Sequence, residues 1–98
     1  MEKHISEVKE IVFYAIEEAN KQLAAKNKVE PSLYLELIGP NRKFDSLGLV
    51  NVIVAIEEQI EIKYNKFISI LGEDNNSSNN SPLKSVKSLI EYLAREIG

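Results

Sequence analysis

The chain has 98 residues, of which 44% are hydrophobic and 28% charged, and its formal net charge is −3. This length fits one domain, residues 1–98, with little room for a catalytic cleft beside a core. Cysteine is absent and His4 is the single histidine, which excludes disulfides and argues against a typical zinc site. The basic residues are scattered along the chain, so nucleic acid is a poor partner.

Two further expectations concern location and the chain end. The sequence has neither an apolar run suited to crossing a membrane nor the charged-then-apolar pattern of a signal peptide. We therefore expect a cytoplasmic protein that does not enter the membrane. His4 lies near the N-terminus, where chains are commonly poorly ordered, so we expect its side chain to be exposed.

The first predicted helix covers residues 3–26. Apolar residues recur there every three or four positions, which lines one face of a helix: Ile5, Val8, Val12, Ile16, Ala19 and Leu23. Asn27 is a candidate left-handed cap. A long connection follows, residues 27–44, interrupted by Pro31, Gly39 and Pro40. Leucines at 33, 35 and 37 alternate with other residues, and we favour a loop that packs them on the helices over an isolated strand.

The second predicted helix covers residues 46–61. Its β-branched residues would favour a strand, but three features favour a helix. Asp45 and Ser46 make a good N-cap signal, the apolar run is long for a strand, and residues 55–59 have high helix propensity. A helix that is apolar on most sides must be central or must present apolar surface to a partner.

The last predicted helix covers residues 83–97 and carries a clean apolar stripe, with Ser81 or Ser85 as the candidate cap. Before it, residues 62–71 are apolar but irregular and leave a short extra helix open. Residues 72–82 form a polar Asn/Ser-rich loop. The sequence therefore predicts an all-α fold, a small bundle of three to four helices with long loops.

The chemistry of the chain centres on Ser46. There is no glycine-rich phosphate loop, metal-ligand cluster or serine–histidine pairing, so an enzyme is not expected. A serine at the start of a helix has an accessible hydroxyl, and the helix N-terminus favours a phosphate group there. Asp45 offers carboxylate oxygens to a metal ion during phosphoryl transfer. The alternative is that Asp45 and Ser46 only cap the helix.

Residues 45–60, DSLGLVNVIVAIEEQI, resemble the signature region of acyl carrier proteins. That family has Asp-Ser-Leu, an apolar helix and then a Glu-Glu pair. Residues 83–93 are similar to the family's last helix, and the long first helix and first loop occur in the same order. The resemblance covers most of the chain.

This resemblance implies a four-helix carrier that is not itself an enzyme. Ser46 would receive 4′-phosphopantetheine from coenzyme A, added by a phosphopantetheinyl transferase, with Asp45 beside it. The thiol of that arm would hold acyl groups as thioesters for loading and processing enzymes of a fatty-acid, polyketide or specialised lipid pathway. A monomer is the family expectation. The second helix would bind partners through five residues: Leu47, Val50, Val54, Glu57 and Glu58.

Departures from the family pattern favour a specialised carrier. Gly48, Leu49 and Asn51 stand where fatty-acid carriers are often polar or acidic, and Ile60 stands where an aromatic residue is frequent. Two other functions stay open: an aminoacyl or peptidyl carrier with the same arm, and an unmodified helical module that binds other proteins. Ordinary core packing is the alternative role for the apolar residues assigned to the partner surface.

Overall fold

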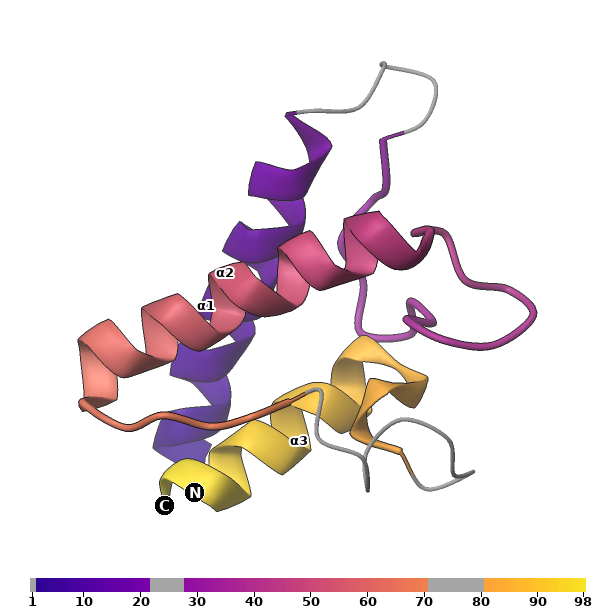
Figure 1. The fold of residues 1–98 in the computed structure, drawn as a ribbon. Coiled ribbons are helices and arrows are strands. Elements are labelled where there is room, and N and C mark those ends of the chain that lie inside the picture. Colours follow the sequence, from indigo (N-terminus) through magenta and orange to yellow (C-terminus); the bar gives the residue numbers. More distant parts are fainter. Residues whose placement is uncertain (1, 22–27, 71–80) are drawn as a thin grey trace.

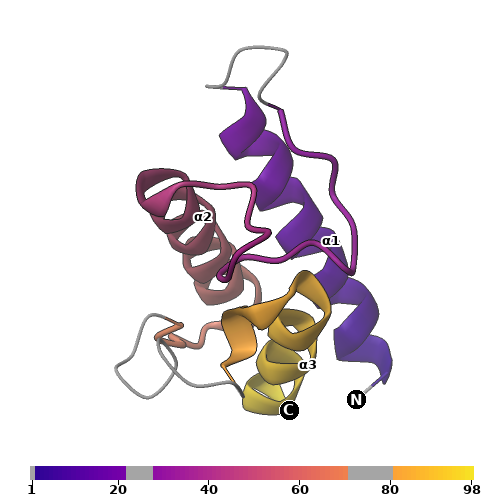
Figure 2. The same ribbon diagram turned by 90° about the vertical axis from the view of Figure 1, so that its right-hand side faces the viewer.

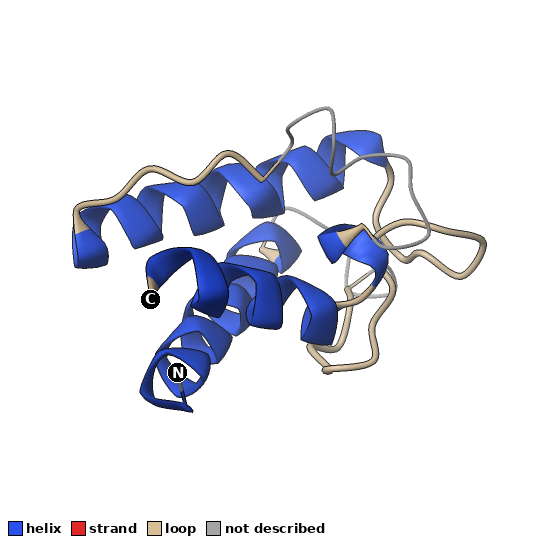
Figure 3. Ribbon diagram, turned by 90° about the horizontal axis from the view of Figure 1, so that it is seen from below, coloured by secondary structure: helices blue, strands red, loops and turns tan. Residues whose placement is uncertain are grey.

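The structure is a computed structural model that describes residues 2–21, 28–70 and 81–98, apart from the side chains of Glu2, Lys3 and Ser46. The described residues contain helices and loops but no strand (Figure 3). The helices are α1 (Glu2–Asn20), α2 (Ser46–Tyr64), the short 3₁₀-helix η3 (Pro82–Lys84) and α3 (Val86–Ile97). The predicted all-α bundle is confirmed: the described residues contain three α-helices, where the sequence predicted three to four.

Helix α1 is the element that both other α-helices pack against (Figures 1 and 2). The predicted stripe faces the core: Val8, Val12 and Ile16 are fully buried. The helix ends at Asn20, whose side-chain amide donates to the carbonyl of Val29 at 2.7 Å and accepts from its N–H at 2.8 Å. Residues 22–27, where the sequence predicted the last turn and the cap, lie outside the described residues.

Helix α2 confirms that the β-branched run is helical, and it continues three residues beyond its predicted end, to Tyr64. Its inward side chains are fully buried and supply much of the core: Val52, Ile53, Ile56 and Ile60. Burial of such side chains stabilises a fold by about 1.5–3 kcal/mol each, which outweighs the weak strand preference of Val and Ile.

The connection from residue 28 to residue 45 is a loop, as predicted. Buried side chains and backbone hydrogen bonds hold it against the helices. Leu37 and Phe44 are buried in the core. The carbonyls of Leu33 and Leu35 accept from the N–H groups of Lys87 and Val86, both at 2.9 Å. The leucine segment therefore bonds to the start of α3, where the first helical N–H groups need acceptors.

Residues 65–70 follow α2 as a loop and run back along it (Figures 1 and 3). Asn65 ends α2 in the left-handed conformation, with φ 54°. Ile68 and Ile70 are buried, so the apolar residues of this irregular stretch pack on the bundle without forming a helix. The short extra helix left open by the sequence is not present between residues 65 and 70.

Both serines that the sequence offered as caps for the last helix are caps in the structure, one of η3 and the other of α3. Ser81 caps η3, and its hydroxyl accepts from the N–H of Leu83 at 3.1 Å. Ser85 caps α3 and forms a reciprocal capping box with Ser88. The predicted apolar stripe of α3 is buried at Val86, Leu89, Ile90 and Leu93 and half-buried at Ile97.

Candidate functional site

The candidate site lies where the long loop meets the first turn of α2. Asp45 is the N-cap: its Oδ1 accepts from the N–H of Gly48 at 2.7 Å, and its carbonyl accepts from the N–H of Leu49 at 2.9 Å. Ser46 is the first residue of the helix. The cap function that the sequence shared between Asp45 and Ser46 therefore belongs to Asp45.

Ser46 occupies a backbone position suited to an anion, although its side chain is outside the described part of the structure. The first turn of α2 contains no acidic residue. Its N–H groups and the helix dipole therefore favour negative charge at this end, opposed only by the carboxylate of Asp45. Asp45 itself is exposed and directly precedes Ser46 in the chain.

The structure explains why position 48 is a glycine, which the family resemblance does not. A Cβ at this position would lie 3.1 Å from Oδ1 of Asp45 and 3.3 Å from the ring of Phe44. Both contacts are tighter than ordinary packing, so a side chain here would push on the capping carboxylate. The departure at residue 48 therefore preserves the cap, and it is not by itself a mark of partner choice.

A hollow of about 250 Å³ opens beside the cap. Its apolar lining comes from the loop and from the first turn of α2: Leu37, Ile38, Phe44 and Leu49. Its polar lining is Arg42 and Asp45. Arg42 was not among the predicted site residues. The sequence does show a basic residue four positions before Ser46, but the Asp-Ser-Leu motif does not extend that far.

The outward side of α2 carries exposed apolar side chains. Leu47 is 70% exposed, Val54 44% and Val50 39%. The core does not hold these three residues, so the core-packing alternative is wrong for them. Successive positions 47, 50 and 54 lie on one face of a helix, and this face, named here the outward face of α2, continues to the exposed Glu58.

Glu57 differs from the other four predicted partner-binding residues. It is half-buried, and its Oε2 accepts from the N–H of Ile70 at 2.8 Å. This contact holds the loop of residues 65–70 against α2. The structure thus brings Leu47, Val50, Val54 and Glu58 together on one face and gives Glu57 a role within the fold.

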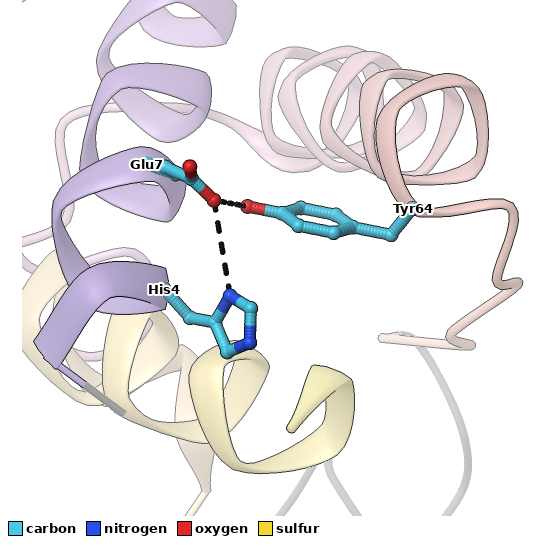
Figure 4. A network of polar contacts seen from close by, with 3 residues as sticks. All are labelled: His4, Glu7 and Tyr64. Atoms are coloured by element: carbon cyan, nitrogen blue, oxygen red, sulfur yellow. Dashed lines mark hydrogen bonds and ion pairs between the residues drawn. The ribbon is translucent and has the colours of Figure 1, made fainter.

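A second polar cluster, formed by His4, Glu7 and Tyr64, lies at the far end of α2 (Figure 4). The hydroxyl of Tyr64 donates to Oε1 of Glu7 at 2.5 Å, and Nδ1 of His4 lies 3.8 Å from the same oxygen. The rings of His4 and Tyr64 meet edge to face at 5.6 Å. His4 is half-buried, so the expectation of an exposed terminal histidine is wrong.

The cluster joins the start of α1 to the end of α2. Burial and the hydrogen bond to Glu7 raise the pKa of Tyr64 to about 12, so the phenol stays protonated near neutral pH and is a weaker acid than an ordinary tyrosine. Among residues 2–21, 28–70 and 81–98, no group of three or more His, Cys, Asp or Glu side chains is placed to hold a metal ion. In the same residues, no helix has the length and apolar character needed to span a membrane.

Comparison of the chain with protein-family models, with curated proteins and with solved structures finds no match in any of the three. The resemblance to acyl carrier proteins therefore depends on the residues quoted for it. What the structure adds is local: a serine at the start of a long helix, a capping aspartate before it, a hollow beside it and an exposed apolar face after it.

Proposed function

We propose that the chain is an acyl carrier protein that is modified at Ser46 with 4′-phosphopantetheine. The observation that carries the proposal is the position of Ser46, which begins a 19-residue helix directly after a capping aspartate. In this position the serine is not needed as the cap. Capping therefore does not explain why residue 46 is a serine. The resemblance of residues 45–60 to the carrier signature indicates modification of its hydroxyl as the explanation.

The residues around Ser46 fit a phosphodiester on its hydroxyl. The first turn of α2 supplies N–H groups and a positive dipole end without an acidic residue of its own. Arg42 and the exposed Lys43 add positive charge on the loop side. When bound, the arm would supply a thiol that carries acyl groups as thioesters, the chemistry this cysteine-free chain lacks.

The chain's own contribution is to position the arm and to receive enzymes. The capping bond of Asp45 fixes the first turn of α2, so the attachment point is held on a rigid helix and not on a mobile loop. The outward face of α2 begins at Leu47, directly after the attachment point. An enzyme that docks there would have its active site within reach of the arm, which suits a transferase and acyl-processing enzymes as partners.

The test is intact-protein mass after incubation with coenzyme A, magnesium and a broad-specificity phosphopantetheinyl transferase. We expect a gain of one phosphopantetheine in the wild type and none in Ser46→Ala. Ser6→Ala, at an exposed serine of α1, serves as the control for loss of a hydroxyl elsewhere. Failure of the folded wild type to gain mass with several transferases would contradict the proposal.

The cargo is a separate part of the proposal. Aminoacyl and peptidyl carriers use the same arm, and the loading enzyme selects what is attached. We place the protein with acyl carriers of a specialised lipid or polyketide pathway, because Leu49 and Asn51 depart from the acidic pattern of fatty-acid carriers. Efficient loading by enzymes of fatty-acid synthesis would contradict the specialised assignment. Loading by an amino-acid-activating enzyme would instead make the protein an aminoacyl or peptidyl carrier.

An unmodified interaction module is the second candidate, and the outward face of α2 favours it. Three exposed apolar side chains on one helix face are a plausible docking surface with or without an arm. The two functions differ in their response to Ser46→Ala: a carrier loses its activity, whereas a module keeps its binding.

A further inference from the structure

The hollow beside the start of α2 has one basic side chain in its lining, that of Arg42. The turn that carries Arg42 is closed by its own N–H, which donates to the carbonyl of Gly39 at 3.3 Å. Gly39 adopts φ 111°, a conformation that other residues rarely take, so the chain reverses here at a fixed point. This turn therefore places Arg42 at the hollow, which it lines together with Leu49 of the first turn of α2.

Arg42 has no ion pair with any described residue. The acidic residue that shares the hollow is Asp45, and one of its carboxylate oxygens already accepts from the N–H of Gly48 at 2.7 Å. The guanidinium has five N–H donors in a planar fork, the geometry that matches phosphate oxygens. Those donors remain available to an anion that enters the hollow.

We propose that Arg42 binds the phosphodiester of the arm carried on Ser46, an inference that rests on the proposed function. A phosphodiester on Ser46 would add a negative charge next to the carboxylate of Asp45 at the same helix end. Two like charges this close disfavour each other. Arg42 and Asp45 line the same hollow, and Ser46 directly follows Asp45 in the chain, so a charge-assisted hydrogen bond from Arg42 to the phosphate would offset that repulsion.

Lys43 is the matched control for this inference. It neighbours Arg42, it is also exposed and it carries the same charge, but it is not among the residues that line the hollow. Arg42→Gln and Lys43→Gln therefore change the net charge identically. Arg42→Lys keeps the charge but removes the planar fork, so it separates general attraction from a specific contact.

The experiment compares unmodified and modified forms of the wild type and of the three variants. Intact mass first establishes whether Ser46 is modified in each. Two readouts then follow: the NMR resonance of the Arg42 Nε–H group, and the difference in melting temperature between modified and unmodified protein. We expect the resonance to shift on modification. We expect that difference to fall by about 4 °C or more in Arg42→Gln, to stay unchanged in Lys43→Gln and to be intermediate in Arg42→Lys.

The outcomes separate the inference from the function on which it rests. Absence of any mass gain at Ser46 would overturn the carrier function and this inference with it. A mass gain combined with an unshifted Arg42 resonance, and with equal melting differences in the two glutamine variants, would overturn the role of Arg42 alone. A mass gain with the expected shift and the expected ranking of variants would support both.

Discussion

The two ends of α2 are built differently. The C-terminal end is fastened to both other α-helices: Tyr64 bonds to Glu7 of α1, and Lys66 just beyond it donates to the carbonyl of Glu96 in α3 at 2.6 Å. The N-terminal end is held by the cap of Asp45 and by the long loop before it, and it opens onto a hollow. The contacts at the C-terminal end of α2 thus stabilise the fold. At the N-terminal end, some polar and apolar side chains stay exposed and do not contribute to the packing.

This difference teaches where function can be sought in a small bundle. A domain of this size has a thin stability margin, so most of its polar side chains in contact are needed for the fold. The cluster of His4, Glu7 and Tyr64 looks like a site by residue type, yet its contacts join helix ends. Arg42, Leu47 and Val54 contribute little to the packing and are therefore candidates for contacts with other molecules.

The largest effect that would sharpen this comparison is expected from Tyr64→Phe. The variant removes a hydrogen bond to a carboxylate without changing the ring that packs against His4. Such bonds are worth about 1.5–3 kcal/mol, and we expect a loss of this size in the free energy of unfolding at pH 7. Urea denaturation measures it, with Tyr34→Phe, whose side chain is 79% exposed, as the control. Equal stability of the two variants would contradict the conclusion that the C-terminal end of α2 stabilises the fold.

The same contact predicts a dependence on alkaline pH. The pKa of Tyr64 is about 12 in the folded protein, above its ordinary value of 10.0. Because folding favours the protonated phenol, its stabilising contribution is complete below pH 10 and is lost as the pH rises from 10 towards 12. The difference in unfolding free energy between the wild type and Tyr64→Phe should therefore shrink over this range. A difference that stays constant up to pH 12 would contradict the raised pKa.

A smaller effect is expected at the open end from Asp45→Ala. This variant removes the cap of α2, which typically costs about 1 kcal/mol of stability. Asp45→Asn keeps an oxygen that can accept from Gly48 and should recover most of the loss. Ser46→Ala should stay within about 0.5 kcal/mol of the wild type, because Asp45 is the cap. A larger loss in Ser46→Ala than in Asp45→Ala would reverse the roles of these two residues.

The elements of the fold follow from local patterns, and their ends do not. The stripe of α3 and its serine caps are periodic and short-range, so the sequence predicts them well. The last turn of α2 is different: Tyr64 bonds to Glu7, 57 residues earlier in the chain. Periodicity carries no information on such a contact. For the same reason the sequence could not predict that His4 would be half-buried against Tyr64.

The candidate site divides in the same way. The start of a helix at Ser46 follows from Asp-Ser and the apolar run, and the structure confirms that start. The sequence cannot divide capping between Asp45 and Ser46, since both residue types cap helices. It also cannot show that Arg42 lines a hollow with Leu49, because the turn at Gly39 sets that arrangement.

The smallest effect on the fold, and the closest test of the open end, is expected from Leu47→Ser. Leu47 is 70% exposed, so its replacement removes little buried apolar surface, and stability should stay within about 0.5 kcal/mol. The initial rate of modification at Ser46 should nevertheless fall, because an enzyme docking on the outward face of α2 would lose an apolar contact next to the reacting serine. Phe67→Ser is the control, since Phe67 is 66% exposed but lies on the segment after α2. Equal modification rates in the two variants would show that docking does not use this face, and a loss of stability near 2 kcal/mol in Leu47→Ser would return that leucine to the core.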